Sequence, residues 1–239
     1  MTGLKGVLFD KDGTLIDFAA SWRSLVDRLL NDLSGGDLAL TSALGGAIGY
    51  DLRTTMFLSG SPVVSGSVEE IAEALAPLLP DRGVAELEDL INKAALKMGV
   101  DEISPVDGLA EALARLKGMG LRLGVGTHDA EGPARAQIEA MGVADQFDFV
   151  AGYDSGHGLK PGPGMPQAFA KAIGAEPGEI AMIGDSLHDL GAGRAAGCGL
   201  VIGVLTGPAR EAELKPHADM VLLSVADFPD FLMRRQNPT

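Results

Sequence analysis

The chain has 239 residues, of which 46% are hydrophobic and 22% are charged, as in an ordinary globular protein. Its 19 basic and 33 acidic residues give a formal net charge of −14. This balance argues against a nucleic-acid partner, because phosphate backbones select basic patches. No apolar run suggests a membrane-spanning helix, and no signal peptide is evident. The single cysteine, Cys198, excludes an intramolecular disulfide. We expect a cytoplasmic protein in which Cys198 is a buried packing residue.

The first expected element is a buried strand over residues 6–9, which ends at Asp10-Lys11-Asp12-Gly13-Thr14. Two carboxylates so close together cost free energy unless a proton or a cation neutralises them. Such a pair suits Mg²⁺, which prefers oxygen ligands. One carboxylate could attack an electrophile while the other transfers protons. The same pattern also occurs in ordinary turns and in calcium loops, so the motif alone leaves both interpretations open.

The next segment, from about residue 18 to 99, has helical periodicity and no convincing strand. We predict helices over 24–33, 67–79 and 84–98, with the glycine pairs at 35–36 and 45–46 as interruptions. The segment is interpreted as a helical insertion after the first strand. The alternative is that these helices belong to a single domain with the rest of the chain.

After residue 100, short apolar runs alternate with helical patterns, which predicts parallel βαβ units and an α/β fold with a Rossmann-like parallel sheet. The expected strands cover 121–126, 147–151, 180–184, 200–204 and 220–223, and the expected helices cover 107–118, 134–141, 165–173 and 187–196. Ligands of such sheets gather beyond the carboxyl ends of the strands. Asp10, Thr127, Lys160 and Asp185 should therefore surround one crevice if their strands are neighbours.

Two of the motifs behind this expectation concern anion binding. Thr127 ends the 121–126 strand, where its hydroxyl and nearby backbone N–H groups could bind a phosphate-sized anion. Alternatively, Thr127 or Asp129 caps the following helix. Lys160 lies in a proline-rich loop and could neutralise both a phosphoryl group and a carboxylate. A single lysine is more often solvated surface.

The last motif follows the 180–184 strand, which stops at Asp185, with Asp189 four residues later. Both carboxylates could face one cation. The alternative is that Asp185 or Ser186 caps a helix and that Asp189 lies on its solvent face.

These motifs occur in the order Asp-x-Asp, Thr, Lys, Gly-Asp-x-x-x-Asp, each at the end of an expected strand. From Gly3 to about Val225 the chain resembles the haloacid dehalogenase-like (HAD) superfamily, and the helical segment lies where that family carries its type 1 cap. The resemblance implies an α/β core formed by residues 1–17 and 100–239 and a helical cap formed by 18–99. It also implies an Mg²⁺-dependent phosphatase that acts on a small phosphorylated metabolite through an aspartyl-phosphate.

The resemblance implies a role for each motif residue. Asp10 would be the nucleophile, and Asp12 would protonate the leaving alcohol and then activate water. Thr127 would bind phosphoryl oxygens, and Lys160 would hold the phosphoryl group and Asp10. The metal ligands would be Asp10, Asp12 through its backbone carbonyl, Asp185, and Asp189 directly or through water.

Three positions refine the resemblance. Asp12 argues for phosphate-ester hydrolysis or phosphoryl transfer, because dehalogenases of the family lack an aspartate there. Lys11 lies where an apolar residue is common, and we expect it to point away from the nucleophile. His128 and Asp129 replace the Asn-rich sequences often seen in phosphoglycolate phosphatases. His128 could touch the substrate or lie on the surface.

Cap residues set specificity in this family, and the candidates are Trp22, Arg23, Arg53 and Lys97. Arg23 and Arg53 could bind a substrate carboxylate or could be surface residues of amphipathic helices. A phosphoglycolate-like ester is the expected substrate, and the protein is expected to be a monomer or homodimer. A β-phosphoglucomutase-like transferase and a non-catalytic module that binds a phosphorylated ligand remain as alternatives.

Overall fold

The computed structural model describes residues 3–58, 60–97 and 103–236. Its central feature is a six-stranded sheet in the order β5-β4-β1-β6-β7-β8, in which every neighbouring pair is parallel. The strands are β1 (Gly6–Phe9), β4 (Arg122–Gly126), β5 (Phe149–Ala151), β6 (Ile180–Gly184), β7 (Leu200–Val204) and β8 (Met220–Leu222). The predicted α/β fold with a parallel sheet is confirmed.

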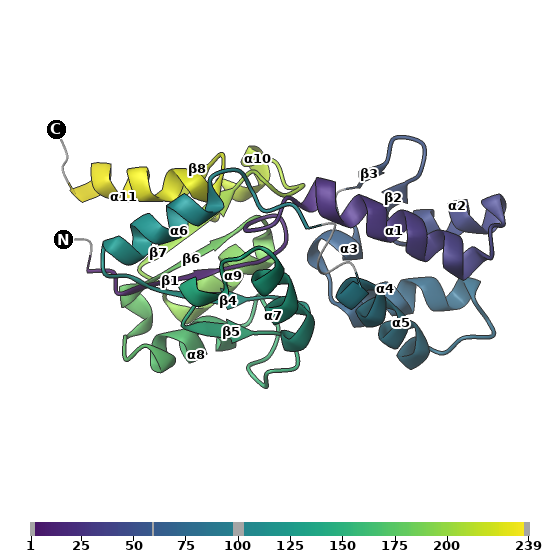
Figure 1. Ribbon diagram of the computed structural model, residues 1–239, viewed down its shortest axis with the longest axis horizontal. Helices are drawn as coiled ribbons and strands as arrows, with labels where there is room; N and C mark the ends of the chain where they lie inside the picture. The colour runs from purple at the N-terminus through teal and green to yellow at the C-terminus, as the bar shows by residue number, and fades with distance from the viewer. Residues whose placement is uncertain (1–2, 59, 98–102, 237–239) are drawn as a thin grey trace.

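Helices cover both faces of this sheet (Figure 1). One face packs against α6 (Leu109–Gly118), α7 (Glu131–Ala140) and α11 (Phe228–Gln236), and the other against α8 (Gly164–Ala172), α9 (Leu187–Ala196) and α10 (Glu211–Leu214). Within β1, Val7 and Phe9 join the first apolar cluster, whereas Leu8 packs with Phe169 of α8. Because both faces of β1 are buried, its sequence is continuously apolar rather than alternating.

The insertion has an apolar core of its own. It contains α1 (Phe18–Ser34), α2 (Leu38–Ala47), α3 (Pro62–Ser65), α4 (Val68–Leu75) and α5 (Val84–Lys97). Their buried side chains, among them Leu30, Leu44 and Leu87, form a cluster separate from those of the sheet. This separation, visible in Figure 1, supports the proposed division into core and cap. The proposed boundary between residues 99 and 100 lies outside the described residues.

The chain enters and leaves the insertion through two adjacent segments. The backbone N–H of Asp17 donates to the carbonyl of Ser104 at 2.8 Å, and that of Val106 donates to the carbonyl of Leu15 at 3.0 Å. These two hydrogen bonds hold the entering and the returning segment side by side next to the insertion.

Two expectations for the insertion were wrong. A small antiparallel pair is present, β2 (Tyr50–Asp51) with β3 (Met56–Phe57). Gly45 and Gly46 lie within α2, a helix that was not predicted, instead of interrupting the chain. A glycine costs a helix roughly 1 kcal/mol relative to alanine, which is why the pair suggested a break. The close packing of residue 45 against the carbonyl oxygen of Tyr50 explains why glycine is nevertheless found in this helix. Any larger residue would place its Cβ only 3.0 Å from that oxygen.

The other boundaries differ by a few residues. Helix α1 begins six residues before the expected start at 24. The predicted helix over 67–79 is α4 followed by the 3₁₀ turn η1 (Ala76–Leu78), and Met98 lies outside the described residues. Further 3₁₀ turns are η2 (Ala144–Gln146), η3 (Pro177–Glu179) and η4 (Val225–Asp227).

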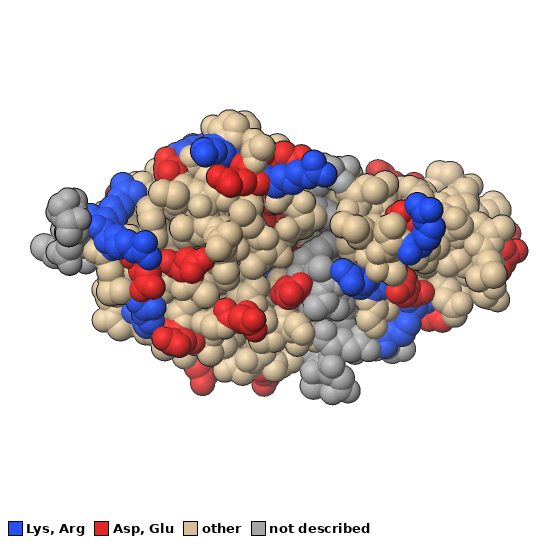
Figure 2. All heavy atoms as spheres, turned by 90° about the horizontal axis from the view of Figure 1, so that it is seen from above, with Lys and Arg blue, Asp and Glu red and all other residues tan. Residues whose placement is uncertain are grey.

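On the face shown in Figure 2, Lys and Arg side chains lie among Asp and Glu rather than in one continuous basic patch. Ion pairs between exposed side chains, such as Arg194–Asp219 at 2.7 Å, also occur among the described residues. Over the described ranges, no helix combines the length and the apolar character needed to cross a bilayer.

Cys198 provides a probe of this fold. It is half-buried, not fully buried as expected, and it packs against the clusters that contain α8 and α9. Burial raises the pKa of its thiol to about 12. Because the thiolate is the reactive form, we expect iodoacetamide at pH 8 to alkylate the native protein more than about 100-fold more slowly than the protein unfolded in guanidinium chloride. Mass spectrometry over time measures both rates, and equal rates would contradict this packing.

Candidate active site

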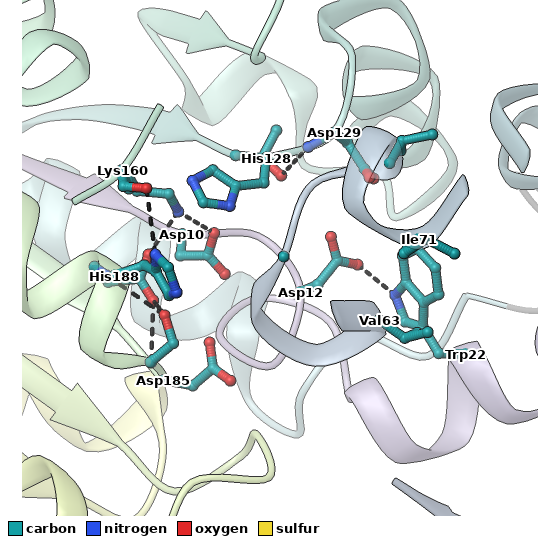
Figure 3. A pocket seen from close by; sticks show the side chains of 15 residues that line it. Asp10, Asp12, Trp22, Val63, Ile71, His128, Asp129, Lys160, Asp185 and His188 are labelled. Atoms are coloured by element: carbon teal, nitrogen blue, oxygen red, sulfur yellow. Dashed lines mark hydrogen bonds and ion pairs between the residues drawn. The ribbon is translucent and has the colours of Figure 1, made fainter. Parts of the chain in front are cut away.

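The strand order brings the predicted motifs to one edge of the sheet. β1 lies between β4 and β6, so Asp10, Thr127 and Asp185 follow the carboxyl ends of three adjacent strands. Lys160 reaches the same place from the loop after β5. All four side chains line one pocket (Figure 3).

Lys160 lies between two carboxylates. Its Nζ is 2.5 Å from Oδ1 of Asp10 and 2.5 Å from Oδ1 of Asp189, and it donates to the carbonyl of Gly126 at 2.9 Å. Burial by itself would lower the pKa of Lys160, but the two carboxylates outweigh it and raise the pKa above its ordinary value. The side chain is only 3% exposed. Lys160 is therefore a charged interior group, and the solvated alternative is wrong.

Asp10, Asp185 and Asp189 form a compact cluster whose ligand atoms lie within 4.8 Å of one another. Burial, followed by the charge of Asp189 and Asp12 and opposed by Lys160, raises the pKa of Asp10 to about 7. Burial and the charges of Asp10 and Asp189 raise the pKa of Asp185 well above its ordinary value. At Asp189, in contrast, burial is outweighed by Lys160 and by the hydrogen bond from Ser186, which lower the pKa. The single ammonium thus offsets burial at Asp189 but not at Asp10 or Asp185.

The oxygen atoms of the cluster are not equally available. Asp189 uses Oδ1 to bind Lys160, and its Oδ2 accepts from the backbone N–H of Ser186 at 3.0 Å and from the Ser186 hydroxyl at 2.6 Å. In contrast, Oδ2 of Asp185 is buried and accepts no hydrogen bond from any described residue. An oxygen-only set with an orphaned buried carboxylate atom fits a hard divalent cation such as Mg²⁺.

Local structure explains the position of Asp189. Ser186 is the N-cap of α9 and forms a capping box with Asp189. Of the two residues considered as the helix cap, Asp185 and Ser186, it is therefore Ser186 that caps the helix. The alternative in which Asp189 lies on the solvent face of the helix is wrong, because the residue is 1% exposed. The capping box turns Asp189 toward the pocket.

Thr127 is buried, and its Oγ1 accepts from the backbone N–H of Asp129 at 3.1 Å. Neither residue caps α7, whose N-cap is Ala130; the first-turn N–H of Glu131 donates to Asp154 instead. The capping alternative for Thr127 and Asp129 is therefore wrong.

His128 is half-buried and lines the pocket beside Lys160. Burial, with a contribution from Lys160, lowers its pKa to about 4, so its ring is neutral at pH 7. Its ring lies edge-to-face with that of His188, with 5.6 Å between centroids. His188 was not predicted, because a histidine on the first turn of a helix has no distinctive sequence signal.

The carboxylate of Asp12 stands apart from the three-carboxylate cluster. Its Oδ1 accepts from Nε1 of Trp22 at 2.8 Å (Figure 3). Its Oδ2 lies 2.5 Å from Nζ of Lys11. Lys11 is fully buried, and among its described contacts it pairs with Asp12 and Asp129 rather than with Asp10. The carboxylate of Asp12 therefore faces Trp22 and Lys11 rather than the three-carboxylate cluster, which is consistent with the predicted use of its backbone carbonyl as a metal ligand.

The insertion covers this site with apolar side chains. Trp22 of α1, Val63 of α3, and Val68 and Ile71 of α4 line the pocket opposite the carboxylates. The two predicted cap arginines do not line it. Successive helix residues point about 100° apart, so α1 directs Trp22 inward and leaves Arg23 exposed, beside Thr206 and Pro208.

Arg53 is exposed in the turn between β2 and β3, at a different surface hollow. Its backbone N–H donates to Asp51 Oδ1 at 2.8 Å, so the turn directs this residue away from the site. The side chain of Lys97 lies outside those described.

A family model described as haloacid dehalogenase-like hydrolase matches residues 4–197. The chain therefore belongs to the haloacid dehalogenase-like hydrolases. It is 31% identical over 240 residues to a phosphoglycolate phosphatase of Rhodospirillum rubrum, an alignment that covers 93% of this chain and 87% of the relative. It is 30% identical over 217 residues to the probable phosphatase IndB of Dickeya dadantii, which covers 91% and 88%. The enzyme thus has phosphatase homologues across nearly its full length.

Solved structures share the fold. A predicted phosphoglycolate phosphatase from Haemophilus somnus superposes with a TM-score of 0.77 at 18% identity, covering 97% of this chain and 99% of that one. A putative β-phosphoglucomutase from Thermotoga maritima gives 0.70 at 17% identity, with the same coverage. The core and the insertion are both included in these superpositions.

Two glycines allow Asp185 its position, and they provide a test of the cation site. Gly13 has a φ of +80°, and a Cβ there would lie 2.5 Å from Oδ2 of Asp185; at Gly207 the separation would be 1.8 Å. We expect Gly207→Ala to displace Asp185 and to weaken Mg²⁺ binding roughly tenfold, the lower end of the usual effect of outer-sphere changes. Isothermal titration calorimetry measures the affinity. Gly118→Ala, where a Cβ meets nothing within 4 Å, is the control, and equal affinity in both variants would refute the assignment of Asp185.

Proposed function

We propose that this protein is an Mg²⁺-dependent phosphatase that hydrolyses a small, phosphoglycolate-like phosphomonoester through an aspartyl-phosphate. The observation that carries the proposal is the placement of Lys160. Its ammonium pairs with one carboxylate oxygen of Asp10 and leaves the other oxygen without this partner. Only Oδ1 of Asp10 pairs with Lys160, so Oδ2 is left to attack phosphorus. Buried positive charge beside an attacking carboxylate is what phosphoryl transfer needs.

The other residues have separate roles in this proposal. Asp12 donates a proton to the ester oxygen as the bond to phosphorus breaks, and it later takes a proton from the water that hydrolyses the aspartyl-phosphate. Lys160, the hydroxyl of Thr127 and nearby backbone N–H groups hold the phosphoryl oxygens. Asp10, Asp185, Asp189 and the backbone carbonyl of Asp12 would hold Mg²⁺, which would supply positive charge to the phosphoryl group when bound.

The pocket favours a small leaving group. Its cavity is about 50 Å³, and its cap side consists of Trp22, Val63, Val68 and Ile71. Since Arg23 and Arg53 lie elsewhere, His128 and His188 are the groups proposed to bind the polar end of the leaving group. The two relatives described as phosphatases support the same reaction class. The likeness to a putative mutase is a likeness of fold.

The first experiment is phosphate release from phosphoglycolate, glucose 6-phosphate and nucleoside monophosphates, with Mg²⁺ and with EDTA. We expect Mg²⁺-dependent turnover that Asp10→Asn lowers by more than about 10⁴-fold, because covalent catalysis loses its nucleophile. Asp145→Asn, an exposed aspartate outside the pocket, is the matched control. Turnover retained by Asp10→Asn would exclude Asp10 as the nucleophile. Isomerisation of a sugar phosphate faster than phosphate release would favour the mutase, and binding without turnover would favour a non-catalytic module.

The cap wall makes a second prediction. Ile71 is buried and lines the pocket, so Ile71→Ala should raise kcat/KM for glucose 6-phosphate relative to phosphoglycolate by roughly tenfold, the scale set by small changes in pocket volume. Leu75→Ala, on the same helix and buried but outside the pocket lining, controls for loosening of the cap. If both variants shift the ratio equally, the wall is not what limits substrate size.

A further inference from the structure

A second buried polar cluster lies beside the site. Lys11 and Gln137 are completely buried and Asp129 nearly so. Nζ of Lys11 is 2.5 Å from Oδ2 of Asp12 and 3.0 Å from Oδ2 of Asp129, and it donates to Oε1 of Gln137 at 2.5 Å. The three partners come from the turn after β1, the loop after β4 and the helix α7, so the tertiary fold assembles the cluster.

This arrangement is expensive for a purely structural feature. Burying an ammonium group costs several kcal/mol unless charged and polar partners compensate it, and an apolar residue would fill the same space at no such cost. An ammonium has three N–H donors, and three oxygen atoms lie around Nζ of Lys11: Gln137 accepts a hydrogen bond, and Asp12 and Asp129 form ion pairs with it. Asp129 and Gln137 thus hold the ammonium beside Asp12.

The cluster is connected to the reacting groups at two points. Asp12 is held at both carboxylate oxygens, by Trp22 at Oδ1 and by Lys11 at Oδ2. The backbone N–H of Asp129 donates to the hydroxyl of Thr127. Restraint at both oxygens sets the plane of the Asp12 carboxylate, and proton transfer requires such alignment.

We propose that Lys11, held in place by Asp129 and Gln137, is a positioning residue that orients the Asp12 carboxylate for proton transfer to the leaving group. The inference rests on the proposed function, in which Asp12 is the acid. In the step concerned, the bond from Asp10 to phosphorus forms, the bond from phosphorus to the ester oxygen breaks, and the Asp12 proton moves to that oxygen.

The role predicts a dependence on the leaving group. An alkoxide needs the proton as it leaves, whereas p-nitrophenolate is a stable anion and needs it little. We expect Lys11→Met to lower kcat/KM roughly 10- to 100-fold for an alkyl phosphate, part of the usual contribution of general acid catalysis. For p-nitrophenyl phosphate we expect a loss below about threefold, with an unchanged Mg²⁺ activation midpoint. Lys5→Met, which removes an exposed lysine paired with Glu179, is the control.

A double-mutant cycle separates positioning from general damage. In the Asp12→Asn background, Lys11→Met should cause no further loss of kcat/KM for the alkyl ester, because the two residues act as one unit. Lys11→Met leaves Asp129 buried without its cation, so Lys11→Met/Asp129→Leu, which removes both charges, provides a second variant should the first fail to fold. Gln137→Leu should also lower kcat/KM more for the alkyl ester than for p-nitrophenyl phosphate, but by a smaller factor than Lys11→Met.

The outcomes are distinct. A wild-type protein that turns over neither ester would overturn the proposed function, and this inference with it. An active wild type whose Lys11 variants lose both esters equally, or lose activity independently of Asp12→Asn, would overturn the positioning role alone.

Discussion

The buried negative charge at the carboxyl end of the sheet is the constraint on which the rest of this structure depends. Asp10, Asp12, Asp129, Asp185 and Asp189 gather there, and two ammonium groups, Lys11 and Lys160, face them. Buried carboxylates are tolerated only when cations or hydrogen bonds compensate them. The two lysines neutralise different carboxylates, since Lys160 pairs with Asp10 and Asp189 whereas Lys11 pairs with Asp12 and Asp129. The uncompensated remainder, centred on Asp185, is where a divalent cation fits.

This division gives the two halves of the Asp-x-Asp motif different environments. Asp10 faces the three-carboxylate cluster, and its pKa rises to about 7 because burial outweighs Lys160. Asp12 is withdrawn from that cluster by Trp22 and Lys11. In the proposed mechanism, the nucleophile and the proton carrier two residues apart can thus act separately, because their side chains meet different partners.

The cap contributes shape more than charge to the described pocket. Its wall is made of Val63, Val68, Ile71 and Trp22, while the polar groups come from the core. In the proposed function, such a wall would exclude water from the phosphoryl group and favour small leaving groups. The indole of Trp22 also connects the insertion directly to the carboxylate of Asp12 through one hydrogen bond.

Much of this could be predicted from local patterns. The strands around Asp10, Thr127 and Asp185 are short apolar runs closed by polar turns, and this signal needs no knowledge of distant contacts. The roles of other residues could not be predicted in this way. Gly45 indicated a break because helix propensity is local, whereas its packing against Leu30 of α1 is not. Arg23 and Trp22 are adjacent in the sequence, and only the seating of α1 shows which one faces the site.

The sequence by itself determined the parallel sheet, the helical insertion and the four motifs at strand ends, because periodicity and turn chemistry act over a few residues. The tertiary structure alone decided that Arg23 and Arg53 lie outside the pocket and that Lys11 meets Asp129 and Gln137. Residues 11 and 137 are 126 positions apart, and only the pairing of β1 with β4 and the packing of α7 bring them together. The energies of burial and charge pairing depend on such contacts, and no local pattern encodes them.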